Sequence, residues 1–490
     1  MDPRLRTLLF GLAASVLAAW VGITIANEEH FIATLCAGVA VWAVLSWTRG
    51  PRAEAWLLAL LFFGYVIGSR GFAQLAPVPG LPLFFSELGL AVVMLLIVLR
   101  GTLHRTLPLQ RDWLNGMLLL WLAIGLGRIP WDMRTYGFIA LRDFAMVYYA
   151  LYFFAAQNLA RHTPSRYLLR TALIGTFAVL PLTGLLASLF PDFFLSNLLV
   201  AGVPLIFYKG DLLGTFLFTG FILLLPAAEF HWNESWWRWL LALVSLVLGL
   251  SLLSRSSMVG LAVAVGWLAM SGRWRPVRLL VAICAIGLIL VTVFSILQKK
   301  DFTQTKAYAI YEAVLSIADY SGTRNYQSEM SSDKGDNNRF RLVWWKNVAQ
   351  ETLSTSPVLG LGFGADLARG FLVEYYPTGE LDFSARSPHN IFMTTLGRMG
   401  LLGVAVLAVV YWVQGRSTLR IARAARADPP GWQDTMTLQA AVWVVMVSAT
   451  LGVVLEGPMG AIPFWIMLGL AHHEATNGDT APLPVGAGRV

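Results

Sequence analysis

Long apolar runs are the feature that most constrains this chain. Runs of about 17–25 residues recur along most of its length, and each can cross the roughly 30 Å hydrocarbon core of a bilayer as a helix. Of the 490 residues, 57% are apolar and 13% are charged, whereas a soluble domain carries about 25% charged residues. These proportions exclude an ordinary soluble enzyme and a disordered chain. A membrane β-barrel would instead alternate apolar and polar residues in segments of about ten. We therefore predict an all-α, polytopic transmembrane helical bundle.

The apolar runs predict about 12–14 spans and one large, partly helical external (periplasmic) loop. The expected spans are at 7–26, 31–47, 54–69, 84–99, 113–127, 138–158, 171–190, 212–229, 238–254, 257–271, 279–297, 397–414, 436–454 and 458–472. We divide the chain into an N-terminal transmembrane bundle (1–297), the periplasmic loop with interfacial helices (298–388), C-terminal transmembrane helices (389–472) and a cytoplasmic tail (473–490).

Basic residues set the expected orientation. The formal net charge is +8, and most Arg and Lys of the short loops fall on one side if both termini are cytoplasmic. This bias follows the positive-inside rule and explains the charge without nucleic acid. The loop 298–388 is then external, which its basic residues permit because long translocated segments escape the rule. Apolar spacing predicts helices at 306–320 and 339–353, followed by the glycine-rich turn SPVLGLGFGADL at 356–367.

Ionisable residues near the outer half of the membrane are costly there and are functional candidates. The candidates are Lys209 in a short outer segment, Arg255 at a turn between two spans, Arg339 and Arg341 in the loop, and Arg142 beside Asp143 inside a span. Each also has a simpler reading, such as an interfacial arginine, a solvated loop residue or, for Arg142 and Asp143, a buried pair. Guanidinium groups suit a lipid diphosphate because they stay charged and donate in a fork.

His389 lies where the external loop re-enters the membrane. We predict Ser387 as the N-cap and Pro388 as the first residue of a helix. His389 would then lie in the first turn, where the helix dipole disfavours the imidazolium form. A neutral imidazole can accept a proton. The alternative is an interfacial histidine that only caps the helix.

Familiar catalytic motifs are missing from the sequence. The GLGFG run has no following Lys-Ser/Thr, so it is not a phosphate-binding P-loop. There is no Asp-x-Asp pair, no HExxH and no cysteine cluster to indicate a metal, and no Gly-x-Ser-x-Gly elbow. We expect neither a metal nor another cofactor.

Three stretches resemble the O-antigen ligase family of bacterial membrane glycosyltransferases, which also includes polysaccharide polymerases. They are SLLSRSSMVGLAVAV (251–265), RFRLVWWKNVAQETLSTSPVLGLGFG (339–364) and SPHNIFMTTLGRMGLLGVAVLAV (387–409), in the family's order. The closing EGPMGAIPFWIMLGLA (456–471) is also similar to the family's last span. The first 200 residues match only as generic spans.

The resemblance implies an enzyme of the bacterial inner membrane, with its active site facing the periplasm. It would transfer a glycan from a polyprenyl-diphosphate carrier to an acceptor hydroxyl without a metal. Carried over by position, His389 becomes the base or acceptor-positioning residue, and Arg255 a diphosphate contact. Arg341, Arg339, Arg142 and Lys209 become further candidate donor contacts, with Asn390 and Glu456 supporting. Where the family often has an arginine before the Ser-Arg span, this chain offers Lys209.

Several functions stay open at this point. The acceptor would be a lipid A core in a ligase or another lipid-linked repeat unit in a polymerase of surface polysaccharide; protein O-glycosylation is a third variant. In a different class, a polytopic transporter or lipid flippase would also contain buried charges. The grouping of candidates on one face favours the enzyme.

Overall fold

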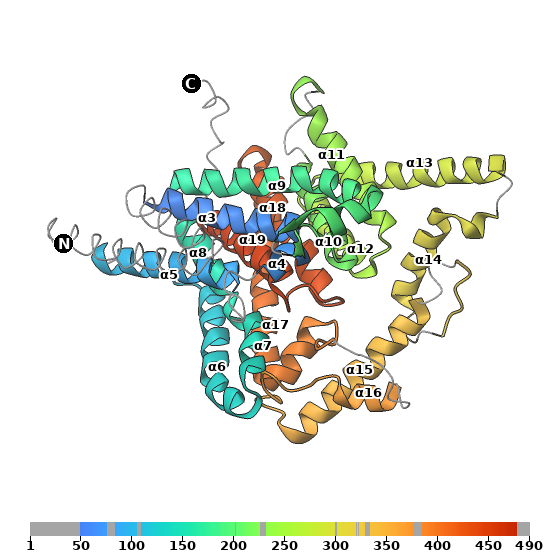
Figure 1. Ribbon diagram of the computed structural model, residues 1–490. Helices are drawn as coiled ribbons and strands as arrows, with labels where there is room; N and C mark the ends of the chain where they lie inside the picture. The colour runs from blue at the N-terminus through green and yellow to red at the C-terminus, as the bar shows by residue number, and fades with distance from the viewer. Residues whose placement is uncertain are drawn as a thin grey trace.

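The computed structural model describes residues 50–75, 84–104, 109–200, 202–225, 232–298, 301–319, 321, 323–328, 334–375 and 385–477. Most of these residues are helical, which confirms the all-α prediction (Figure 1). The spans expected at 7–26 and 31–47, and most of the expected tail, lie outside the described residues. The elements before the large loop are α3 (Pro51–Phe63), η1 (Gly64–Gly68), α4 (Arg70–Gln74), α5 (Phe85–His104), α6 (Trp113–Tyr136), α7 (Phe138–Tyr148), α8 (Leu151–Ala160), α9 (Thr163–Leu189), η2 (Phe193–Asn197), β1 (Leu199–Val200), β2 (Val203–Pro204), α10 (Gly210–Leu224), α11 (Trp232–Ser251), α12 (Arg255–Met270) and α13 (Trp274–Gln298).

Within the described ranges, six helical segments are long and apolar enough to cross a membrane, and five shorter helices are also apolar. The protein is therefore a multi-pass membrane protein of the predicted class. The six are Pro51–Gly68, Phe85–Thr102, Trp113–Tyr136, Phe138–Ala160, Thr163–Leu189 and Ile391–Ala427. The expected span 138–158 is not one uninterrupted α-helix, because α7 ends at Tyr148 and α8 begins at Leu151.

The centre of the bundle consists of α8, α10, α12, α18 (Pro429–Ala449) and α19 (Pro458–Asn477), which pack against one another. Almost every side chain of α10 and α19 is buried, so these helices are surrounded by protein. Figure 1 shows α9 and α3 covering this centre. The strands β1 and β2 form one short antiparallel hairpin just before α10.

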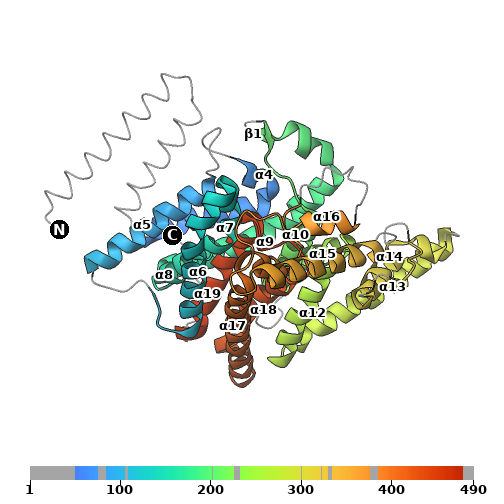
Figure 2. The same ribbon diagram turned by 90° about the horizontal axis from the view of Figure 1, so that it is seen from below.

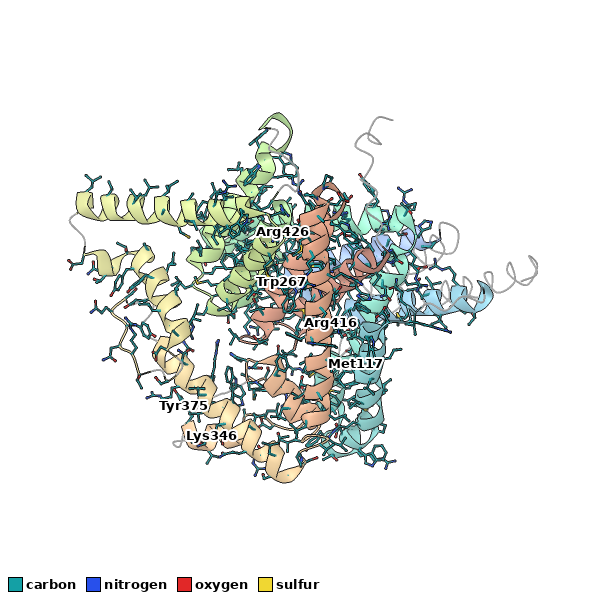
Figure 3. All side chains as sticks on the ribbon, turned by 180° about the vertical axis from the view of Figure 1, so that it is seen from behind. Met117, Trp267, Lys346, Tyr375, Arg416 and Arg426 are labelled. Carbon is teal, nitrogen blue, oxygen red and sulfur yellow. The ribbon has the colours of Figure 1, made fainter. Side chains whose placement is uncertain are left out.

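The predicted external loop contains η3 (Phe302–Gln304), α14 (Lys306–Ala318), α15 (Lys334–Thr355) and α16 (Arg369–Tyr375). Both helices predicted in this loop are thereby confirmed. Figure 1 shows α14 descending from the far end of α13 towards α15, which lies with α16 beside the lower part of the bundle, and Figure 2 shows α15 and α16 side by side from below. In Figure 3, Lys346 and Tyr375 on these helices lie at the opposite end of the molecule from Arg426.

The chain returns to the bundle through α17 (Ile391–Ala427). Gly400 interrupts its helical geometry with a φ of 64°, so a short segment precedes the kink and a long one follows it. The short segment begins at Ile391, two residues after His389, and packs against the loop helix α15. This kinked entry places the residues around His389 between the loop and the bundle.

Candidate active site

Arg255 is the first residue of α12 and follows Ser254 at the N-cap position. The predicted turn between two helices is therefore correct. Its guanidinium donates to the Ser316 hydroxyl at 3.4 Å and to the side-chain oxygen of Asn338. These partners belong to α14 and α15, so Arg255 joins the bundle to the loop that was predicted to be external.

Arg341 comes from α15 and meets Arg255 across a shared cavity. Its Nη1 donates to the Leu451 carbonyl at 2.9 Å, in the connection between α18 and α19. The cavity has a volume of about 140 Å³ and a mainly apolar wall that includes Val259 and Trp345. Two guanidinium groups from segments far apart in the sequence therefore face one small cavity.

Lys209 precedes α10 as its N-cap residue, and Asp211 lies in the first turn of that helix. Both charges lie close enough to His389 to act on its pKa, as does the charge of Arg341. The structure thus places Lys209 and Arg341 near His389. Arg255 belongs to the same group because it lines one cavity with Arg341.

His389 occupies a different local structure from the one predicted. Helix α17 begins at Ile391, and Asn390 is its N-cap, accepting the N–H groups of Phe392 at 2.8 Å and Met393 at 3.2 Å. The predicted N-cap Ser387 and first helical residue Pro388 are therefore wrong. His389 lies before the helix with a φ of 57°, a left-handed conformation that is uncommon for a residue with a side chain.

The predicted neutrality of His389 has another cause. Partial burial and the positive charges of Arg341 and Lys209 lower the pKa of its imidazole from 6.5 to about 4, against the opposing effect of Asp211. The helix dipole is not needed, because His389 is outside the helix. The described residues supply no hydrogen bond to its imidazole, which packs instead against the rings of Phe340 and Trp344, with centroids 6.4 and 5.8 Å away.

Glu456 holds both sides of the His389 segment. Its Oε1 accepts hydrogen bonds from the Ser387 hydroxyl at 2.9 Å and the Thr394 hydroxyl at 3.2 Å. Asn390 and Glu456, both expected as supporting residues, thus contact the backbone or side chains directly around His389.

Two predicted donor contacts are placed differently. Arg142 is exposed, and its neighbour Asp143 pairs with Arg386 and Arg398 at 3.1 and 2.8 Å. The suggested Arg142–Asp143 pair is therefore wrong. Arg339 is also exposed, because two residues along a helix turn a side chain by about 200° away from the face of Arg341.

Comparison with known families shows which family the segment around this site resembles. Residues 239–408 match the family model described as O-antigen ligase. This segment belongs to the O-antigen ligase-related family. It contains Arg255, Arg341 and His389, whereas Lys209, Asp143 and Glu456 lie outside it. No curated protein sequence matches the chain. The match supports a membrane glycosyltransferase-like function of the ligase and polymerase type, in polysaccharide biosynthesis.

A buried ionic network beside the ligase-family site was missed by sequence reasoning. Arg398 is 2% exposed; besides Asp143, it donates to the carbonyls of Gly362 at 3.1 Å and Ala365. Arg386 bonds Asp143 and the Gly364 carbonyl at 3.0 Å. The sequence did contain a signal for this network, because Arg398 lies within the apolar run NIFMTTLGRMGLLG, where a charge needs a partner.

The same network fixes the glycine-rich turn of the ligase-family segment. The N–H groups of Phe363 and Gly364 donate to Asp132 at 2.7 Å and Asp143 at 3.0 Å, respectively. Helices α6 and α7 thereby anchor the loop that precedes His389. Over the described ranges, no group of three or more His, Cys, Asp or Glu side chains gathers as a metal site would require.

Proposed function

We propose that the protein moves a glycan from a polyprenyl-diphosphate carrier to an acceptor hydroxyl at the outer leaflet of a bacterial inner membrane. Its product would be lipopolysaccharide or another surface polysaccharide. One observation carries the proposal: Arg255 and Arg341 line a single cavity, and His389 lies near enough to feel the charge of Arg341. Both termini would be cytoplasmic and the cavity would face the periplasm, in keeping with the distribution of basic residues.

The chemistry follows from charge. The acceptor oxygen attacks the anomeric carbon of the glycan while neutral His389 takes the hydroxyl proton. The bond from that carbon to the diphosphate oxygen breaks, and the polyprenyl diphosphate leaves with the electron pair. Arg255, Arg341 and Lys209 stabilise the negative charge that develops on the leaving group. No step requires a metal, and the apolar cavity wall suits an isoprenoid chain beside its diphosphate.

The supporting residues have separate roles. Asn390 starts the helix after His389, and Glu456 binds Ser387 and Thr394 on either side of it. These contacts fix the backbone that carries the imidazole, which a base needs for correct geometry. Arg339 and Arg142 are left without a role in this proposal, because both side chains are exposed.

The test is a turnover assay in nanodiscs with a polyprenyl-diphosphate-linked oligosaccharide, with and without a lipid A core acceptor. The wild type is compared with His389→Ala and with His162→Ala, whose imidazole bonds Ser165 at the start of α9. A single product that requires the core indicates a ligase, and a ladder without the core indicates a polymerase. We expect no product from His389→Ala, normal product from His162→Ala, and no inhibition by a chelator. Folded wild-type protein that forms no product with either acceptor contradicts the proposal and directs the work to lipid flux assays.

A further inference from the structure

Trp345 connects the cavity to the segment that carries His389. Its indole lines the cavity together with Arg255 and Arg341. The indole Nε1–H also donates to the Pro388 carbonyl at 2.6 Å, one residue before His389. One side chain therefore touches both halves of the candidate site.

The spacing on α15 explains this double contact. Arg341 and Trp345 are four residues apart and share one face of the helix, which borders the cavity. Phe340 and Trp344 form the adjacent pair, and their rings contact the imidazole of His389. Helix α15 thus presents one row of side chains to the cavity and the next row to the candidate base.

The backbone of His389 needs to be held in place. A non-glycine residue at a φ of 57° is strained, and this conformation persists only when the surroundings fix it. The hydrogen bonds that fix the preceding residues include Arg386 to Asp143, Ser387 to Glu456, and Trp345 to Pro388. Of these three contacts, the one from Trp345 comes from a side chain that also lines the cavity.

We propose that Trp345 is a positioning residue that holds His389 at a fixed place relative to the cavity of Arg255 and Arg341. This inference rests on the proposed function. Trp345 itself takes no proton and carries no charge. It fixes the distance between the base and the leaving group, and the rate of transfer depends steeply on that distance.

The variant Trp345→Phe isolates this contribution because it keeps an aromatic ring and removes the N–H. We expect kcat to fall about tenfold, the size of effect that one lost hydrogen bond can produce. We expect KM for the glycan donor to change less than about twofold, because the guanidinium groups remain. Backbone hydrogen exchange of the peptide covering 385–393 becomes faster, because one of its ties is lost.

Trp443→Phe is the matched control. Its indole donates to the Thr418 hydroxyl at 2.9 Å within the bundle, remote from His389 in the sequence. It loses the same kind of hydrogen bond, and we expect wild-type kcat and wild-type exchange of 385–393. Trp345→His, which keeps an N–H donor on a ring, is expected to recover part of the protection lost in Trp345→Phe.

The exchange measurement decides the inference independently of turnover. Wild-type exchange in Trp345→Phe overturns it, even if kcat falls, and so does a loss expressed in KM alone. Faster exchange confined to 385–393 supports the structural tie, and a fall in kcat beside it supports the positioning role. Should the wild type form no glycan product, the proposed function fails, while the exchange data still show whether Trp345 holds the segment.

Discussion

The backbones of Gly360 and Gly400 touch. A Cβ on either glycine would lie 2.5 Å from the backbone nitrogen of the other, and both have positive φ, 77° and 64°. Hydrogen bonds surround the contact: the Leu361 N–H donates to the Gly397 carbonyl at 2.7 Å, and the Leu401 N–H to the Pro357 carbonyl at 2.8 Å. The glycine-rich turn is therefore docked on the kink of α17, ten or so residues after His389.

Replacing Gly360 with alanine tests this contact. The new Cβ meets backbone atoms that have no room to move, and the positive φ adds strain. We expect Gly360→Ala to lower the Tm clearly and to reduce turnover, measured by thermal unfolding in detergent and by the transfer assay. Gly116→Ala on α6, where a Cβ meets nothing within 4 Å, is the control and should leave the Tm equal or higher. Equal Tm values for both variants would contradict the docking.

Asp143→Asn tests the buried network. It removes the charge that compensates Arg386 and the almost fully buried Arg398. Leaving a buried charge without its partner costs about 3–5 kcal/mol, so we expect a large loss of stability in chemical or thermal unfolding. Lys346→Gln breaks an exposed pair with Glu374 and should change stability little. A small effect of Asp143→Asn would show that the network contributes little to the fold.

The pH dependence of kcat/KM tests the neutral base. The pKa of His389 is lowered to about 4, and the neutral form needed for catalysis predominates above that value. We therefore expect kcat/KM to stay level as the pH falls from about 8 to about 5, and to decline toward 4. Arg341→Gln removes a positive charge that lowers this pKa, so the decline should begin at a higher pH. If kcat/KM of the wild type instead declined around the ordinary histidine pKa of about 6.5, the lowered pKa of His389 would be contradicted.

Arg255→Lys tests the need for a forked donor. Lysine keeps the charge but offers a point charge without the planar pair of donors. We expect kcat/KM to fall about tenfold for Arg255→Lys and about a hundredfold or more for Arg255→Gln, the usual effect of removing a donor to a developing negative charge. Arg416→Gln is the control, since its guanidinium lies over the Trp412 ring on the long part of α17 (Figure 3). The loss of kcat/KM from wild type to Arg255→Lys measures the forked geometry, and the further loss to Arg255→Gln measures the charge.

The sequence predicted the elements whose signals are local. Apolar runs gave the helical class, and the spacing of apolar residues gave α14 and α15. Arg255 was placed correctly because its Ser-Arg turn between two apolar runs is visible along the chain. The ligase-family resemblance was likewise carried by short ordered motifs and is supported by the match over 239–408.

The errors arose where tertiary contacts determine local structure. Ser-Pro before an apolar run is a good helix start. Here, however, the Ser387 hydroxyl donates to Glu456, and the Pro388 carbonyl accepts a hydrogen bond from Trp345. The helix therefore starts at Ile391, with Asn390 as the cap. Arg142 and Asp143 are neighbours in sequence, yet successive side chains on a helix point about 100° apart. Asp143 consequently pairs with Arg398 in α17 and with Arg386 in the segment before α17. No local sequence pattern could indicate these distant partners.

Asp143 and its partner Arg386 are 243 residues apart, and Asp132 and Phe363 are 231 apart. A chain made from its N-terminus thus inserts both carboxylates long before their partners leave the ribosome. Until α17 is made, the glycine-rich turn lacks its contact with Gly400, and the helix that follows His389 does not exist. We therefore expect a nascent or truncated copy to remain inert toward lipid-linked glycan, so that transfer begins only in chains whose synthesis is nearly complete.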